Sequence, residues 1–166
     1  MIETNKILVI IDMQNDFCIE EKYKASKVIP LIKKRLEYYR KNNYQVIYTK
    51  DISIDPIKQI SEGFVPMCIE NTWGCEIIDE LKPLSQDIII KKYKFIFDNW
   101  EQFSEIFENS IIEIVGIYTE FCVYGNTFEI SKFCRNVNVI SNECIGLRED
   151  MTADALKYMK IFANVI

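Results

Sequence analysis

The feature that most constrains the fold is a regular alternation between short apolar runs and segments with helical periodicity. Each run is rich in β-branched residues and only four to seven residues long, which is typical of a buried strand. The segments between the runs repeat apolar residues every three or four positions, as amphipathic helices do. The predicted strands are residues 6–11, 45–49, 87–90, 111–117 and 137–141.

Apolar strands that alternate with helices predict a parallel sheet, because right-handed crossovers place helices over both faces. We therefore expect an α/β fold, a three-layer doubly wound sandwich with a mainly parallel sheet of five or six strands. Val165 and Ile166 would begin the sixth strand, and no linker divides residues 1–166, so a single domain is expected. The predicted helices are residues 28–42, 76–81, 99–108, 121–135 and 152–163.

The chain of 166 residues contains no histidine, which removes whole classes of mechanism. A Ser-His-Asp triad, a Cys-His dyad, a His-based zinc protease site and a haem with an axial His all need an imidazole. Acid and base chemistry must therefore use Asp, Glu, Lys, Cys or Tyr. The formal charge of −5, with Lys scattered among Glu, argues against a nucleic-acid partner.

Targeting signals and cysteine usage point to the cytoplasm. No run approaches the ~20 apolar residues of a membrane span, and the N-terminus lacks the order of a secretory signal. The six cysteines include no Cys-x-x-Cys pair, so each is first interpreted as a small buried hydrophobic residue. We expect a cytoplasmic protein with no membrane partner.

Reactive side chains follow the predicted strands where the carboxyl ends of a parallel sheet form ligand sites. Asp12 follows the first strand, Lys91 and Lys92 follow the third, and Cys122 comes shortly after the fourth. Polar residues often end strands for structural reasons, so any single position would be weak evidence. Together, however, a carboxylate, an amine and a thiol make a nucleophile site that needs no histidine.

Cys122 has a further local argument. Thr119 is a good N-cap and would place Cys122 at the third position of the following helix. There the helix dipole and the free backbone N–H groups are expected to lower the thiol pKa and could hold an oxyanion.

Four segments resemble the isochorismatase-like cysteine hydrolases, a family that includes nicotinamidases: residues 11–17, 68–74, 90–97 and 116–123. The resemblance implies Asp12 as the catalytic base, Cys122 as the nucleophile and Lys91 as the catalytic lysine, with Lys92 as the adjacent alternative. It also implies a cis peptide before Tyr118, with the N–H groups of Tyr118 and Cys122 forming an oxyanion hole. Members commonly associate, which implies a homodimer or homotetramer.

The same resemblance bears on the substrate. Metal-dependent nicotinamidases carry histidines beside the residue that matches Asp51, whereas here Ile52, Ser53 and Ile54 follow it. A lone Asp51 supplies too few ligands for zinc, so no metal and no cofactor are expected. Asp51 would then cap a turn or hydrogen-bond a polar substrate group. Two aromatic residues are expected to line the pocket or to pack in the core, Phe17 and Trp73.

The sequence thus predicts a cysteine hydrolase, an amidase that cleaves a small carboxamide or carbamoyl compound through a thioester on Cys122. True isochorismatases tend to lack the nucleophilic cysteine, so Cys122 favours a carbonyl substrate. Three alternatives stay open. They are a catalytically silent small-molecule-binding member of the fold, an isochorismatase-type hydrolase and a thiol-redox protein.

Overall fold

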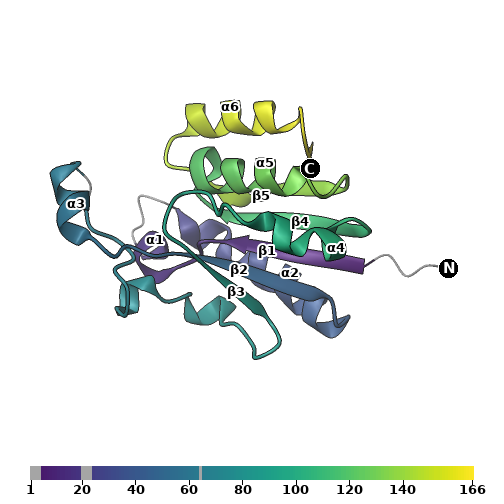
Figure 1. Cartoon of the computed structure of the whole chain (residues 1–166), viewed down its shortest axis with the longest axis horizontal. Coiled ribbons are helices and arrows are strands. Elements are labelled where there is room, and N and C mark those ends of the chain that lie inside the picture. The colour runs from purple at the N-terminus through teal and green to yellow at the C-terminus, as the bar shows by residue number, and fades with distance from the viewer. Residues whose placement is uncertain (1–4, 20–23, 64) are drawn as a thin grey trace.

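The computed structural model of the chain describes residues 5–19, 24–63 and 65–166, which form a sheet flanked by helices (Figure 1). The sheet has six strands in the order β3-β2-β1-β4-β5-β6, and every neighbouring pair is parallel. The predicted doubly wound α/β fold is confirmed, with the sixth strand present. The strands are β1 (Asn5–Ile11), β2 (Gln45–Asp51), β3 (Ile88–Lys92), β4 (Ser110–Ile117), β5 (Val137–Ile145) and β6 (Asn164–Val165).

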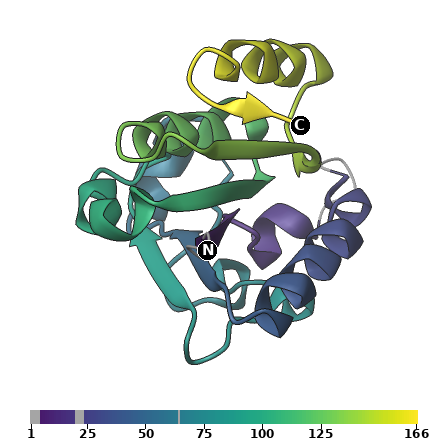
Figure 2. The same cartoon turned by 90° about the vertical axis from the view of Figure 1, so that its right-hand side faces the viewer.

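Helices cover both faces of the sheet (Figure 2). On one face lie α1 (Asn15–Cys18) and α2 (Ile29–Lys41), and on the other lie α4 (Ser104–Phe107), α5 (Tyr124–Ser131) and α6 (Glu149–Met159). The two-residue period of β1 serves both layers, since Leu8 faces α2 while Ile7 faces the opposite core. None of the described helices has the length and apolar content that a bilayer crossing requires.

Several predicted helices are shorter than their apolar patterns suggested. Residues 76–81 contain only the 3-10 turn η4 (Asp79–Leu81), because residues 76–78 instead form an antiparallel bridge with the segment that follows β1. Residues 99–108 divide into the 3-10 turn η5 (Trp100–Phe103) and α4. The remaining one-turn elements are η2 (Ala25–Lys27), η3 (Trp73–Cys75), the π-helical turn η6 (Thr119–Val123) and the short helix α3 (Pro56–Ser61).

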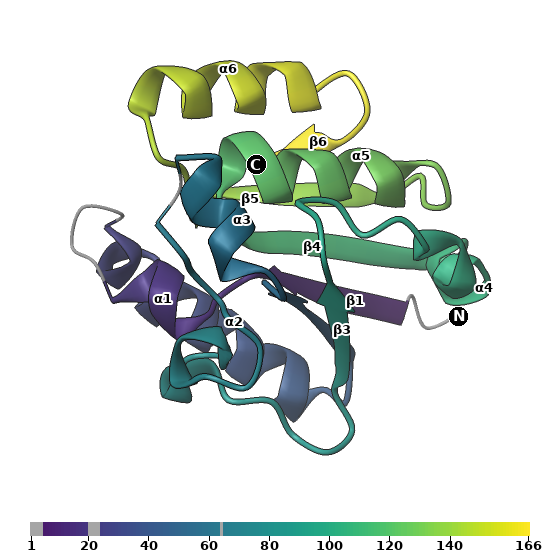
Figure 3. The same cartoon turned by 60° about the vertical axis from the view of Figure 1, so that its left-hand side comes forward.

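The strand order reverses between β1 and β4, so their carboxyl ends form the topological switch point where such sheets bind ligands. Gly116 of β4 lies opposite Ile11 of β1, and a Cβ at Gly116 would come within 2.2 Å of the Ile11 carbonyl oxygen. Only glycine allows this close approach. Figure 3 brings this edge of the sheet forward, with α1 and α3 beside it.

Candidate active site

Asp12 and Cys122 meet beyond the carboxyl ends of the two central strands. Asp12 directly follows β1, and Cys122 lies in η6, the turn that follows β4. Both residues are buried, with 0% and 4% of their surface exposed. The Asp12 carboxylate is close enough to the Cys122 thiol to raise its pKa. The structure therefore brings together two of the three side chains that were expected to form the site.

The lysine that reaches this pair is Lys92, and the assignment of Lys91 is corrected. Lys92 Nζ lies 2.7 Å from Asp12 Oδ2 and 3.7 Å from Cys122 Sγ. Lys91 is directed elsewhere, because its Nζ lies 3.3 Å from Glu70 Oε1 and its side chain is 54% exposed. Side chains alternate between the faces of a strand, so an alignment error of one residue exchanges a buried cation for an exposed one.

Thr49 fixes the orientation of the Asp12 carboxylate. Thr49 Oγ1 donates to Asp12 Oδ1 at 2.6 Å and accepts from the Asp12 backbone N–H at 3.2 Å. One carboxylate oxygen is thus held by a hydroxyl and the other by the Lys92 ammonium. Sequence reasoning missed Thr49. The available signal was the polar pair Thr49 and Asp51, two residues apart and therefore on one face of β2.

Asp51 is the second carboxylate on the lysine. The parallel register pairs Asp51 with Lys92, and Asp51 Oδ1 accepts from Lys92 Nζ at 2.9 Å. Burial raises the pKa of Asp51 and Lys92 opposes that rise. Burial alone would lower the pKa of Lys92, but Asp12, Cys122 and Asp51 raise it above its ordinary value. The lysine therefore stays charged between two carboxylates.

Burial holds the Cys122 thiol in its neutral form. It raises the thiol pKa well above its ordinary value, Asp12 raises it further, and Lys92 lowers it. The expectation of a lowered pKa is therefore wrong, because desolvation outweighs the helix terminus. Thr119 is not an N-cap either. It lies inside η6, and its buried hydroxyl has no hydrogen-bond partner among the described residues.

A neutral thiol beside a carboxylate is arranged for proton transfer at the moment of attack. The Asp12 carboxylate lies close enough to the Cys122 thiol to raise its pKa, so the thiol proton can move to the carboxylate as sulfur bonds to a substrate. The Lys92 ammonium near Sγ favours the thiolate that this transfer produces. The arrangement can therefore generate a nucleophile without an imidazole.

Among the remaining predicted site residues, Tyr118 and Phe17 lie near the turn that leads to Cys122. Trp73 is the exception. The peptide bond between Ile117 and Tyr118 is cis, as the resemblance implies. Phe17 is buried and meets Tyr118 edge-on, with ring centroids 5.3 Å apart. Trp73 is 62% exposed, and its carbonyl accepts from Asn15. Substrate contact by Phe17 and Trp73, and oxyanion binding by the N–H groups of Tyr118 and Cys122, stay predictions.

Gln14 is a second residue that sequence reasoning did not single out. Its fully buried amide connects the turn after β1 to the end of β2. Gln14 Nε2 donates to the carbonyls of Asp51 at 2.8 Å and Cys75 at 2.9 Å, and Oε1 accepts from the Asp51 N–H at 2.7 Å. These bonds fix the backbone that carries the Asp51 carboxylate. A third missed residue, Asn126, follows Cys122 by one helical turn.

The residues around Asp51 do not fit a metal ion. The Asp51 carboxylate is already paired with Lys92, and the side chains of Ile52 and Ile54 carry no donor atom. Within the part of the chain that the structure describes, no group of three His, Cys, Asp or Glu residues is arranged to hold a metal. Protein zinc sites usually take three or four such ligands.

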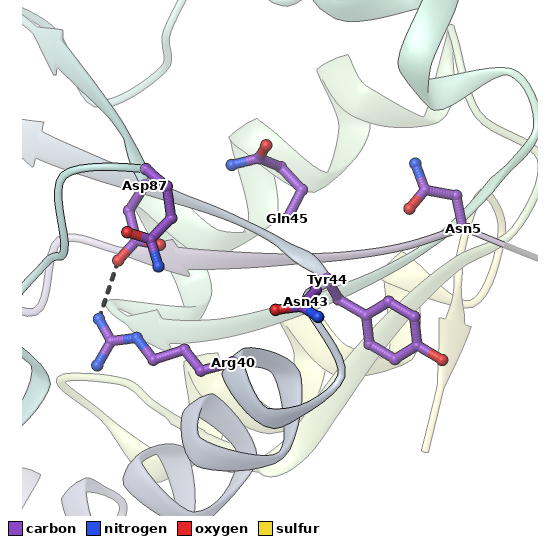
Figure 4. Close-up of a pocket in the computed structure, with 7 residues that line it drawn as sticks. Asn5, Arg40, Asn43, Tyr44, Gln45 and Asp87 are labelled. Carbon is purple, nitrogen blue, oxygen red and sulfur yellow. Dashed lines mark hydrogen bonds and ion pairs between the residues drawn. The ribbon is translucent and has the colours of Figure 1, made fainter.

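A separate hollow of about 320 Å³ lies at the opposite, amino edge of the sheet (Figure 4). Arg40 borders it, but the Nη2 atom of its guanidinium already contacts three neighbouring groups. Its Nη2 lies 2.9 Å from Asp87 Oδ2, 2.8 Å from the Lys82 carbonyl and 3.3 Å from the Tyr48 hydroxyl. Arg40 therefore connects α2 to the segments around β2 and β3, and the hollow holds none of the predicted site residues.

Comparison with known proteins agrees with this arrangement. The profile described as Isochorismatase domain matches residues 6–166. The chain is 23% identical over 176 residues to the nicotinamidase/pyrazinamidase of Mycobacterium tuberculosis, covering 93% of this chain and 94% of that protein. The pyrazinamidase of Pyrococcus horikoshii, solved in complex with zinc, matches with a TM-score of 0.82 at 20% identity over 98% of each chain. The N-carbamoylsarcosine amidase of Thermoplasma acidophilum matches with a TM-score of 0.79 at 18% identity, over 98% of this chain and 95% of that one.

Proposed function

The chain belongs to the isochorismatase family, and on that premise we propose that it is a cysteine amidohydrolase acting on a small carboxamide or carbamoyl compound. The observation that carries the proposal is the buried cluster of Asp12, Lys92 and Cys122. In it the Lys92 ammonium lies 2.7 Å from Asp12 Oδ2 and 3.7 Å from Cys122 Sγ. The proposed base and the proposed nucleophile thus both contact the cation before substrate binds.

The proposed reaction has two halves. In the first, the thiol proton of Cys122 moves to Asp12 while Sγ attacks the substrate carbonyl carbon, and Lys92 stabilises the developing thiolate. The N–H groups of Tyr118 and Cys122 receive the oxyanion. Asp12 then returns the proton to the leaving nitrogen as the C–N bond breaks, which leaves a thioester on Cys122.

In the second half, water hydrolyses the thioester. Asp12 accepts a proton from the water as its oxygen attacks the thioester carbonyl, and it returns that proton to sulfur as the acid leaves. The carboxylate therefore acts as base and then as acid in each half. The cycle restores the neutral thiol that the raised pKa of Cys122 favours.

The charge of the cluster favours uncharged substrates. Asp12, Asp51 and Lys92 carry a formal sum of −1, so a substrate with its own carboxylate next to the reacting carbonyl would be repelled. Asp51 is the only partly exposed member of the three, at 19% of its side chain, and its carboxylate can accept a hydrogen bond from a substrate N–H. Phe17 and Trp73 would supply apolar contact.

Three further features belong to the proposal. The mechanism needs no metal and no cofactor, since Asp12 and Lys92 supply the proton transfer and the charge. The only partner it requires is the small-molecule substrate. The chain is expected to form a homodimer or homotetramer. The names of the relatives, a nicotinamidase/pyrazinamidase and an N-carbamoylsarcosine amidase, support amide or carbamoyl cleavage.

Mass spectrometry tests the proposal. The protein is incubated with a panel of neutral carboxamides and ureido compounds, and ammonia release and the mass of the Cys122 peptide are followed. We expect an acyl adduct on Cys122 and on none of the other five cysteines. Cys122→Ala should abolish both adduct and turnover.

The same experiment separates the other functions. The absence of an acyl adduct on Cys122, with no ammonia released, would contradict the proposal and indicate a silent binding protein. Turnover retained in Cys122→Ala would indicate a reaction that needs no acyl-enzyme, as in isochorismatase-type hydrolysis.

A further inference from the structure

We infer that Asn126 is a positioning residue that sets the distance between the Lys92 ammonium and the Cys122 thiol. The inference rests on the proposed function, because it concerns how the nucleophile is held. Asn126 is 0% exposed and lies one helical turn after Cys122, at the start of α5. No contact with substrate is required for this role.

The donor half of the Asn126 amide joins two segments that are distant in sequence. Asn126 Nδ2 donates to the Cys122 carbonyl at 2.7 Å and to the Phe95 carbonyl at 3.0 Å. The first bond stays within the helical turn of the nucleophile. The second reaches the segment that follows β3, 31 residues earlier in the chain. One NH₂ group thus connects the nucleophile turn to the lysine segment.

The lysine segment in turn contacts the lysine itself. Lys92 Nζ donates to the carbonyl of Lys94 at 3.2 Å, and Lys94 is the residue before Phe95. A closed ring results, which runs from Cys122 Sγ to Lys92 Nζ, through the backbone of residues 94–95 to the Asn126 amide, and back to the Cys122 carbonyl. A shift of the segment relative to α5 would therefore move the ammonium relative to the sulfur.

The acceptor half of the amide anchors the same segment further along. Asn126 Oδ1 accepts from the Phe97 backbone N–H and from Trp100 Nε1, both at 2.9 Å. An Asn side chain offers two donors and two acceptor sites, so its four bonds use its full capacity. Gly125 adds packing, since a Cβ there would lie 2.5 Å from Ile96 Cγ1. The segment is thus seated closely on α5.

A substitution at Asn126 can separate the positioning role from ordinary helix stability. Thr is close to Asn in volume, and its hydroxyl can donate to the carbonyl four residues back. Thr127 shows this geometry, with Oγ1 donating to the Val123 carbonyl at 2.7 Å. Asn126→Thr should therefore keep the bond to Cys122 and lose the bonds to Phe95, Phe97 and Trp100. Thr127→Val is the matched control, because it removes a buried hydrogen bond of α5 outside the ring.

The readout is the rate of Cys122 alkylation by iodoacetamide, measured by mass spectrometry on the full chain as the pH is raised from neutral through the high midpoint expected of a buried thiol, with thermal unfolding as a check of the fold at each pH. Lys92 favours the thiolate, so a loosened lysine should slow alkylation and move its pH midpoint upward. We expect Asn126→Thr to react on the order of tenfold more slowly with a raised midpoint. Thr127→Val should stay within about twofold of the parent protein.

Equal rates in the two variants, or a slower Asn126→Thr with an unchanged midpoint, would overturn the inference. If Asn126→Thr does not fold, Asn126→Ser makes the same test with a smaller side chain. Failure of the proposed function looks different, because the parent protein itself would then form no acyl adduct on Cys122 with any of the amides. Failure of the inference leaves that adduct intact.

Discussion

Two clusters in this protein each place one cation between two carboxylates, and they differ in the cation and in what else it contacts. The thiol cluster, at the carboxyl edge of the sheet, comprises Asp12, Asp51, Lys92 and Cys122. The arginine cluster, between α2 and the strands β4 and β5, comprises Arg35, Glu113 and Glu143. Each set of one cation and two carboxylates has a formal charge of −1.

In the arginine cluster, hydrogen bonds hold the Arg35 guanidinium in one orientation. Arg35 donates to both oxygens of Glu143, from Nε at 2.7 Å and from Nη2 at 2.8 Å, and to Glu113 from Nη1. These bonds raise the pKa of Arg35 further above its ordinary value, Glu143 contributing most. A forked guanidinium that serves both carboxylates has a structural role, since it connects a helix to two strands.

The thiol cluster uses a lysine, which is a point charge with three donors and no preferred fork. Lys92 is fully buried and meets one oxygen of each carboxylate, a backbone carbonyl and the sulfur. The Lys92 ammonium can therefore stabilise the negative charge that forms on sulfur when the thiol loses its proton. The comparison teaches that the same balance of charge connects a helix to two strands in one place and surrounds a buried thiol in another. The added thiol and the deeper burial make the difference.

Lys92→Met should have the largest effect. It removes the cation that favours the thiolate and leaves two carboxylates unpaired in the interior, so we expect turnover to fall on the order of 10²- to 10³-fold. The free energy of unfolding should decrease by about 3–5 kcal/mol. The pH midpoint of Cys122 alkylation should move upward. Urea denaturation and alkylation kinetics measure these effects, and a midpoint that stays in place would contradict the role of Lys92.

Asp12→Asn should move the same midpoint in the opposite direction. The Asp12 charge raises the pKa of Cys122, so its removal should shift alkylation to lower pH. Turnover should nevertheless fall by about 10²- to 10⁴-fold, because the group that accepts and returns the proton is lost. Faster labelling with lost turnover would distinguish a base from a merely structural carboxylate. A midpoint that rises would show that Asp12 does not face the thiol.

Arg35→Met should affect stability alone. Its side chain is 24% exposed, so we expect the free energy of unfolding to decrease by about 2 kcal/mol. This value lies between those for buried and for exposed ion pairs. The rate and pH midpoint of Cys122 alkylation should match those of the parent protein. Chemical denaturation gives the loss, and a shift in the midpoint would mean that the two clusters are coupled.

Lys91→Met is the control for the neighbouring lysine and should have the smallest effect. Lys91 is half exposed and pairs with Glu70 at 3.3 Å, so less than about 0.5 kcal/mol of unfolding free energy is at stake. Alkylation of Cys122 should be unchanged. A loss of turnover comparable with that of Lys92→Met would refute the assignment of the lysine.

Much of the fold could be predicted from the sequence because its signals are local. Five of the six strands follow from apolar runs, and Val165 marked the sixth. Helix ends were harder. The segment expected to be helical from residue 121 begins with a π-helical turn at Thr119, and α5 ends at Ser131. Periodicity locates a helix, but packing against the rest of the chain decides where it stops.

The sequence predicted which types of side chain meet at the candidate site. It predicted only some of the individual residues. Asp12 and Cys122 follow central strands, so the chain order already placed them at one edge. The sequence did not single out three of the residues around the site, because each forms a hydrogen bond with a partner at least 26 residues away in sequence. They are Thr49, Gln14 and Asn126. A buried threonine or amide has no signature of its own, since its role depends on the groups that surround it.

By itself, the sequence determined that this chain folds as a parallel α/β sheet and that any acid and base chemistry must use groups other than imidazole. Only the tertiary structure decided that the amine belongs to Lys92 and that the Cys122 thiol is neutral at rest. The strand register selects one of two adjacent lysines, and burial by distant segments outweighs the local field of a helix end. Both depend on atoms that are brought together only when β1, β2, β3 and β4 pack side by side.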